Sequence, residues 1–223
     1  VKTKDLQIEV NTLFNSNEIV EFDLQNFKSP IQDFKLNYKI DENKISIKGN
    51  KLTLDKIDIF DESSFDKDDL DLNLVIQNFN LGEMTFFDSK INLLKSNGSF
   101  ENMLVDLKGE NDFHKITIED EIEVKKFVLE SNYIPGLLNI FDIDLNINQG
   151  SIKIEGLRPK NNVEYEGVIV GKNIVFYDAP FFANFFSIFS LEGFAQKLKD
   201  GGIIFNTFNS NYKFGNDRLK IID

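Results

Sequence analysis

The sequence predicts a mostly β protein, an antiparallel sheet with short helices near the C-terminus. Three observations support this fold class. Apolar and polar residues alternate along most of the 223-residue chain, a pattern typical of strands with one dry and one wet face. Short polar breaks of hairpin length separate these runs. One long stretch alone, residues 178–205, carries apolar residues at helical spacing.

The first strands are expected between residues 6 and 47. Polar breaks at residues 41–43 and 48–50 have the length of hairpin turns, so successive strands should pair with their sequence neighbours. The apolar residues that alternate here are Leu6, Ile8, Val10, Phe22, Leu24, Phe34, Leu36, Tyr38, Ile40, Ile45 and Ile47.

The same pattern continues to residue 124. It shows that one face avoids water, but it fits a closed sandwich as well as a long curved sheet around an apolar groove. We predict that Leu36 and Leu72 lie on this face. The later members of the pattern are Leu52, Leu54, Ile57, Ile59, Leu70, Leu72, Leu74, Ile76, Met84, Phe86, Ile91, Leu93, Phe100, Leu107, Ile116, Ile118, Ile122 and Val124.

The pattern changes near Ser131. Residues 132–141 lose the alternation and predict a short helix or turn, so we place a boundary here between two units, residues 1–130 and 131–223. Strands then resume. Their apolar residues are Leu145, Ile147, Ile152, Ile154, Val168, Val170, Ile174 and Phe176, followed after the helical stretch by Ile203, Phe205, Tyr212, Phe214, Leu219 and Ile221.

Two short helices that meet near Ser190 are expected at about residues 180–199. Pro180 suits a first helical turn, and Gly201 with Gly202 suits a helix exit. Apolar residues cover more than one face, so the rings either plug the end of the sheet as core or line the mouth of a lipid groove. We predict the second for Phe181, Phe182, Phe185, Phe186, Phe189 and Phe194.

Composition narrows the function classes. A formal net charge of -12 argues against nucleic-acid binding and against electrostatic docking on anionic lipid. The absence of Cys rules out disulfides and thiolate metal sites. The chain starts at Val1 and has no apolar run of about 18 residues, so we expect a piece of a longer protein whose anchoring segment lies outside it.

No catalytic, cofactor or metal site is predicted. His114 is the one histidine and is expected on the solvated surface, so we predict that the protein is not an enzyme. The acidic run at residues 66–71 lacks the spacing of a calcium loop and is expected to be a solvated turn entering a strand. Asn97-Gly98-Ser99 matches a glycosylation sequon, but Asn-Gly first indicates a tight turn.

Several sequence blocks in the second half carry a family resemblance. In order they are the 133–141 segment with its Leu137-Leu138 pair, the 148–154 turn and strand, the 170–180 run that ends Tyr-Asp-Ala-Pro, the 185–193 stretch and the Gly-Gly-Ile-Ile-Phe block at 201–205. Over residues 130–223 the chain resembles the AsmA-like superfamily of Gram-negative envelope proteins, especially the C-terminal region of YhdP-type members. Residues 1–130 match it only in texture.

The resemblance implies a taco-like curved sheet with an apolar groove. It also implies a periplasmic protein, anchored in the inner membrane by an N-terminal segment, that moves phospholipid between the inner and outer membranes without a cofactor. The alternative is an interaction module that helps to assemble outer-membrane proteins by docking other envelope proteins through a sheet edge or helix.

Overall fold

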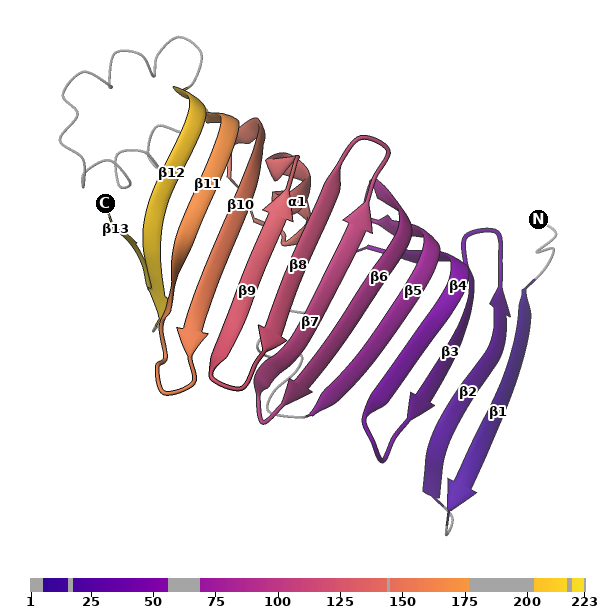
Figure 1. Cartoon of the computed structure of the whole chain (residues 1–223). Helices are drawn as coiled ribbons and strands as arrows, with labels where there is room; N and C mark the ends of the chain where they lie inside the picture. Colours follow the sequence, from indigo (N-terminus) through magenta and orange to yellow (C-terminus); the bar gives the residue numbers. More distant parts are fainter. Residues whose placement is uncertain are drawn as a thin grey trace. The chain divides into compact units, whose positions relative to one another are not determined.

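The structure is a computed structural model that describes residues 6–15, 18–55, 69–143, 145–176, 203–215 and 218–222. Within these residues the chain forms 13 strands, hydrogen-bonded in sequence order in an open sheet, and one short helix (Figure 1). The mostly β fold class and the pairing of sequence neighbours are therefore confirmed. The predicted helices at about residues 180–199 lie outside the described residues. The chain divides into two compact units, residues 1–127 and 128–223.

The first unit contains eight strands and the start of a ninth. Every strand pair from β1 to β8 is antiparallel except β4–β5, which is parallel. The β4–β5 pair is thus an exception within the predicted antiparallel sheet. A parallel pair needs a crossover of about a dozen residues or more, and residues 55–69 supply that length. The strands are β1 (Gln7–Asn15), β2 (Glu18–Lys28), β3 (Asp33–Lys39), β4 (Lys44–Leu54), β5 (Leu70–Leu81), β6 (Met84–Ser96), β7 (Ser99–Lys108), β8 (Phe113–Asp120) and β9 (Val124–Ser131).

Cross-strand rows of apolar residues explain why these strands pair in this register. Directly paired residues lie on the same face of a sheet and pack against each other. One such row crosses seven strands without a polar member and includes Leu36, which confirms that Leu36 belongs to the apolar face. The row runs Leu24, Leu36, Ile47, Leu74, Ile91, Val105, Ile116. A parallel row contains Leu72, paired with Ile45 and Leu93.

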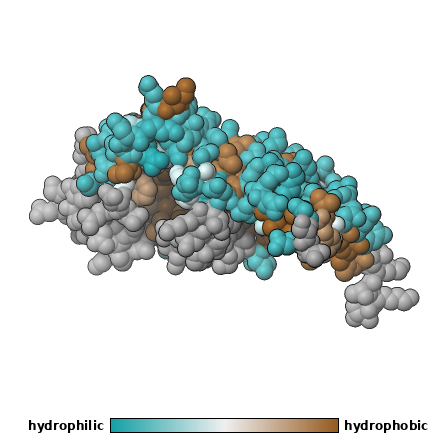
Figure 2. Space-filling view, turned by 90° about the horizontal axis from the view of Figure 1, so that it is seen from below, coloured by the Kyte–Doolittle hydropathy of each residue, from teal (hydrophilic) through white to brown (hydrophobic). Residues whose placement is uncertain are grey.

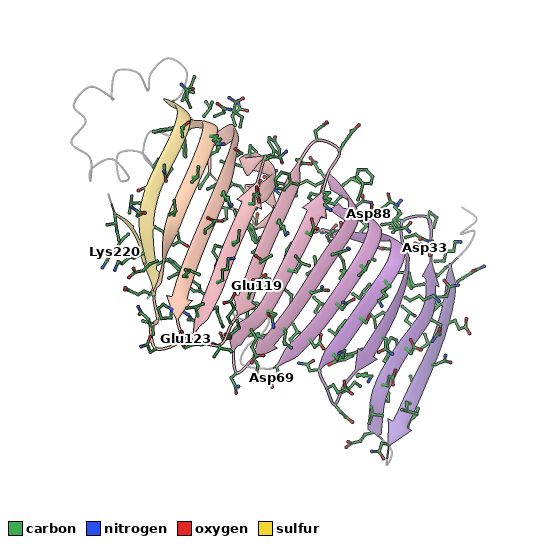
Figure 3. The ribbon with its side chains drawn as sticks, in the orientation of Figure 1. Asp33, Asp69, Asp88, Glu119, Glu123 and Lys220 are labelled. Atoms are coloured by element: carbon green, nitrogen blue, oxygen red, sulfur yellow. The ribbon has the colours of Figure 1, made fainter. Side chains whose placement is uncertain are left out.

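Irregular positions also line up across this unit. The pairing skips or shifts at Asn50 of β4, at Gln77 of β5 and at Asp88 of β6, where φ is 49°. Figure 3 shows Asp88 and Asp33, another residue beside a register shift, towards the same end of their strands. An irregularity of this kind moves the following side chains to the other face and bends the strand. Accordingly the buried residues Ile76 and Phe79 are three positions apart rather than two or four.

The apolar face of the first unit is filled at strands β5 to β8. Ile76, Phe79 and Leu107 are 0% exposed, and the Phe79 and Phe86 rings pack with centroids 6.4 Å apart. Asn97 (φ 50°) and Gly98 (φ 75°) form the β6–β7 turn, as predicted.

His114 contradicts its predicted surface position. It is 1% exposed on the apolar face, edge-on to Phe86 with ring centroids 5.8 Å apart. Burial lowers its pKa, while Asp112, whose Oδ2 lies 3.5 Å from Nε2, acts in the opposite direction. The polar residues around His114 in the sequence hid the fact that it occupies an inward position, two residues before Ile116.

The second unit contains the end of β9, helix α1 (Ile134–Ile140) and strands β10 (Ile147–Pro159), β11 (Tyr165–Phe176), β12 (Ile203–Gly215) and β13 (Arg218–Ile222). The pairs β10–β11, β11–β12 and β12–β13 are antiparallel. The predicted helix or turn at residues 132–141 is confirmed as α1, which starts with Pro135 in its first turn and contacts β10. No helix in the described part of the chain is both long and apolar enough to cross a bilayer.

Candidate functional site

An apolar cavity of about 300 Å³ lies within the second unit. α1 and the segment that follows it form one wall, and strands β9 to β13 form the others. Every described lining residue has an aliphatic or phenyl side chain. They are Leu129, Ile134, Leu137, Leu138, Phe141, Ile143, Leu145, Ile147, Ile152, Ile154, Ile169, Ile174, Phe176, Phe205, Phe208 and Ile221.

Strand irregularities decide which residues face this cavity. On β11 the lining residues Ile169 and Ile174 are five positions apart, and on β12 Phe205 and Phe208 are three apart. A regular strand puts only even spacings on one face. The odd spacings arise where the β11–β12 pairing skips Asn173, whose φ is 52°.

On β10 the same change of face occurs between the lining residues Ile147 and Ile152. Here the register shifts on both sides of Gln149, and Gly150 has φ 125°. A Cβ at position 150 would lie 2.9 Å from the Cα of Ile174, so the close approach of these two strands requires glycine.

The helical wall is fixed by local hydrogen bonds. Ser131, which is 1% exposed, accepts a hydrogen bond from the Tyr133 backbone N–H at Oγ (3.1 Å) just before α1 begins. After the helix, the Ile143 backbone N–H donates to the Leu138 carbonyl (2.9 Å), which turns the chain back towards β10. α1 buries Ile134, Leu137 and Ile140. Of these, Ile134 and Leu137 also line the cavity, so the buried side of the helix borders it.

Three aromatic rings line the cavity at the β11–β12 side. The Phe176 and Phe205 rings meet edge to face with centroids 5.9 Å apart, and the Phe205 and Phe208 rings do so at 6.5 Å. Edge-to-face contacts hold rings in defined orientations. These rings give the cavity a fixed apolar wall.

The charged side chains of β10 lie away from the cavity. Lys153, between the lining residues Ile152 and Ile154, points to the other face and pairs with Glu155 (Nζ–Oε1 2.8 Å). The hydrogen bond that Lys153 donates to Glu155 raises the pKa of Lys153. With no ionisable group among its described lining residues, the cavity suits an apolar ligand rather than proton transfer. Among the described residues, no group of three or more His, Asp or Glu is placed to hold a metal ion.

The sequence-predicted site and the observed cavity overlap only in part. Phe181, Phe182, Phe185, Phe186, Phe189 and Phe194 lie outside the described residues, so their role stays a prediction. Residues that the sequence placed on apolar strand faces, such as Ile154 and Phe205, line the cavity.

Other lining residues were missed. The alternation favoured Val168 and Val170 as inward residues of β11, whereas Ile169 is the one that lines the cavity and is 9% exposed. Asn173 could have indicated this change of face, because Asn tolerates the left-handed conformation that an irregular strand position needs.

The chain was compared with protein-family models, with curated proteins and with solved structures, and none of the three comparisons finds a match.

Proposed function

We propose that the protein is a non-enzymatic segment of a Gram-negative envelope lipid-transport protein, which binds phospholipid acyl chains in an apolar β-groove. One observation carries the proposal, namely the cavity of about 300 Å³ whose described lining is apolar throughout. This volume lies at the lower end of the range typical of ligand pockets. A segment of an acyl chain, rather than a whole lipid, matches it.

Binding is driven by removing methylene groups from water. Each buried methylene contributes about 0.8 kcal/mol. Since the described lining residues offer no hydrogen-bonding side chain, an acyl chain gives up no hydrogen bond by entering, whereas a polar ligand leaves its hydrogen bonds to water unreplaced. The site therefore discriminates by apolarity and not by a specific polar contact.

The sequence resemblance supports the envelope setting. The blocks that resemble AsmA-like proteins supply much of the lining, including Leu137 and Leu138 from the 133–141 block and Phe205 from the 201–205 block. In this proposal the protein works in the periplasm, with phospholipid and the two membranes as its partners.

A charge placed in the cavity tests the proposal. Ile154 lines the cavity and is half-buried, so Ile154→Asp should leave the chain folded but expel acyl chains, because an acyl chain would have to desolvate the carboxylate. Leu157, three residues further along β10, is 50% exposed and outside the lining, so Leu157→Asp is the matched control.

The readout is phospholipid retained on purification and taken up from vesicles, measured by lipid extraction and native mass spectrometry. We expect lipid on the wild type and on Leu157→Asp, and little on folded Ile154→Asp. Absence of lipid from the wild type in both assays, or equal lipid on all three proteins, would contradict the proposal.

A second candidate function, an interaction module for outer-membrane protein assembly, is favoured by one specific feature. All nine residues of β1 are exposed, and in the order of the described strands β1 neighbours β2 alone. Figure 2 shows apolar surface at the right-hand end, where Figure 1 places β1 and β2, and Ile8 and Leu13 are more than half exposed. An exposed edge of this kind accepts an added strand. Folded protein that captures a partner through β1 but binds no lipid would favour this alternative.

A further inference from the structure

A second cavity, of about 470 Å³, adjoins the apolar one. Leu138, Ile143, Leu145 and Ile147 line both. The second cavity differs by having two polar side chains in its lining, those of Asn139 and Asp142. The two cavities therefore match the two parts of an amphiphile. One is apolar, and the lining of the other contains a carboxylate.

The backbone of Asp142 is fixed at the end of α1. Its φ of 53° puts it in the left-handed region, directly after α1, and its N–H donates to the Asn139 carbonyl (3.3 Å). Asp142 is exposed, and within the described part of the chain no Lys, Arg or His pairs with it. The carboxylate is thus available to a ligand.

Among the described residues that line the two cavities, no positive charge offsets this carboxylate. Neither cavity has Lys, Arg or His among its described lining residues. Between Lys126 and Lys153 the sequence contains no basic residue at all, but it does contain Glu130, Asp142 and Asp144. A ligand head that lies here meets a negative field, which attracts an ammonium group and repels a head with net negative charge.

We propose that the two cavities together select an amphiphile whose head carries an ammonium group, as in an ethanolamine lipid, over one of net negative charge, with Asp142 as the selecting residue. This inference rests on the proposed function, because the acyl chain must occupy the apolar cavity. The head's phosphate stays on the solvent side, since the described lining residues include no Lys or Arg to pair with it.

The test compares lysophosphatidylethanolamine with lysophosphatidylglycerol of the same acyl chain, each below its micelle concentration, binding to the full chain at low ionic strength. We expect about a fivefold preference for the ethanolamine lipid, the size of a solvent-exposed charge pair, and a smaller preference at high salt. Asp142→Asn keeps a residue type that tolerates left-handed φ, so it should stay folded and bind the two lipids equally.

Glu164→Gln is the control, because it removes the same charge in the β10–β11 turn, away from both cavities, and should keep the preference. Equal binding of the two lipids by the wild type, or a preference that survives Asp142→Asn, overturns this inference while the proposed function stands. Failure of the wild type to bind either lipid overturns both.

Discussion

Strands in both units of this protein have an apolar face, but the side chains on the two faces are buried to different extents. At strands β5 to β8 of the first unit the apolar face is filled, and its largest fully buried side chains, Phe79 and Phe86, are at most 1% exposed. In the second unit most residues that line the cavity are half-buried, among them Leu138, Ile152 and Phe208. The difference teaches that an alternating strand pattern identifies a dry face but not whether protein or ligand keeps it dry.

Local structure accounts for the open space in the second unit. α1 and the chain up to Ile147 occupy the place between two strands where a hairpin turn would otherwise suffice. This segment contributes its own apolar wall to the cavity, from Leu137 to Leu145. A helix that borders a sheet face only along one edge leaves room beside it, and a hydrophobic space of this size suits a ligand.

The largest expected effect is a difference in stability cost between Ala substitutions on the filled face of the first unit and in the cavity of the second. Phe79→Ala should cost about 3–5 kcal/mol, because a fully buried ring is lost and a void remains. Leu138→Ala should cost only about 1 kcal/mol, because this side chain already borders open space. Denaturant unfolding of the two variants checks this, and equal losses would mean that the cavity is as well packed as the core.

The irregular strand positions should respond differently in the two units. Asp88→Val and Asn173→Val each force a β-branched residue into left-handed φ, at a cost of about 1–2 kcal/mol. Only Asn173→Val should also weaken lipid binding, because it disturbs the inward position of Ile174. Thermal melting and lipid uptake of both variants test this, with Asp88→Asn and Asn173→Gly as conformationally tolerant controls. Unchanged lipid uptake by folded Asn173→Val would contradict a role for the irregular position of Asn173 in lipid binding.

The smallest expected effect is the loss of stability at acid pH that buried His114 causes. The pKa of His114 is lowered from 6.5 in the folded chain, so between that lowered value and 6.5 the unfolded chain binds more protons. The resulting stability is present in full above pH 6.5 and is lost as the pH falls through the folded pKa. His114→Phe keeps a ring against Phe86 but does not titrate.

Melting curves at pH 7.5 and pH 5.5 measure this pH-dependent contribution of His114 to stability. The wild type should lose more stability than His114→Phe over this interval, since the carboxylates titrate in both proteins. Identical losses would show that burial of His114 does not govern the acid sensitivity of this unit.

Much of the fold could be predicted from the sequence because strand alternation and turn residues are local signals. The row from Leu24 to Ile116 and the Asn97-Gly98 turn follow from them directly. The parallel β4–β5 pair could not be predicted, since local patterns do not encode the relative direction of two strands joined by a long connection. Ile169 was missed because Asn173 shifts the face of β11. Inward His114 was missed because polar neighbours hide its position.

The candidate site was predictable in kind but not in position. An apolar groove was one of two arrangements that fit the strand pattern and the one that the family resemblance implied, whereas the lining of the observed cavity depends on the placement of α1 beside β10. Helical periodicity drew attention to residues 180–199 instead, because it is the stronger sequence signal.

Photo-crosslinking tests the central claim, lipid in the second unit's cavity, most directly. Benzoylphenylalanine replaces either Phe208, which lines the cavity, or Phe87, which is 42% exposed on β6 of the first unit. After irradiation of the protein with phospholipid vesicles, we predict a lipid adduct by mass spectrometry at position 208 and little or none at position 87. No adduct at position 208, or equal adducts at the two positions, would contradict the account.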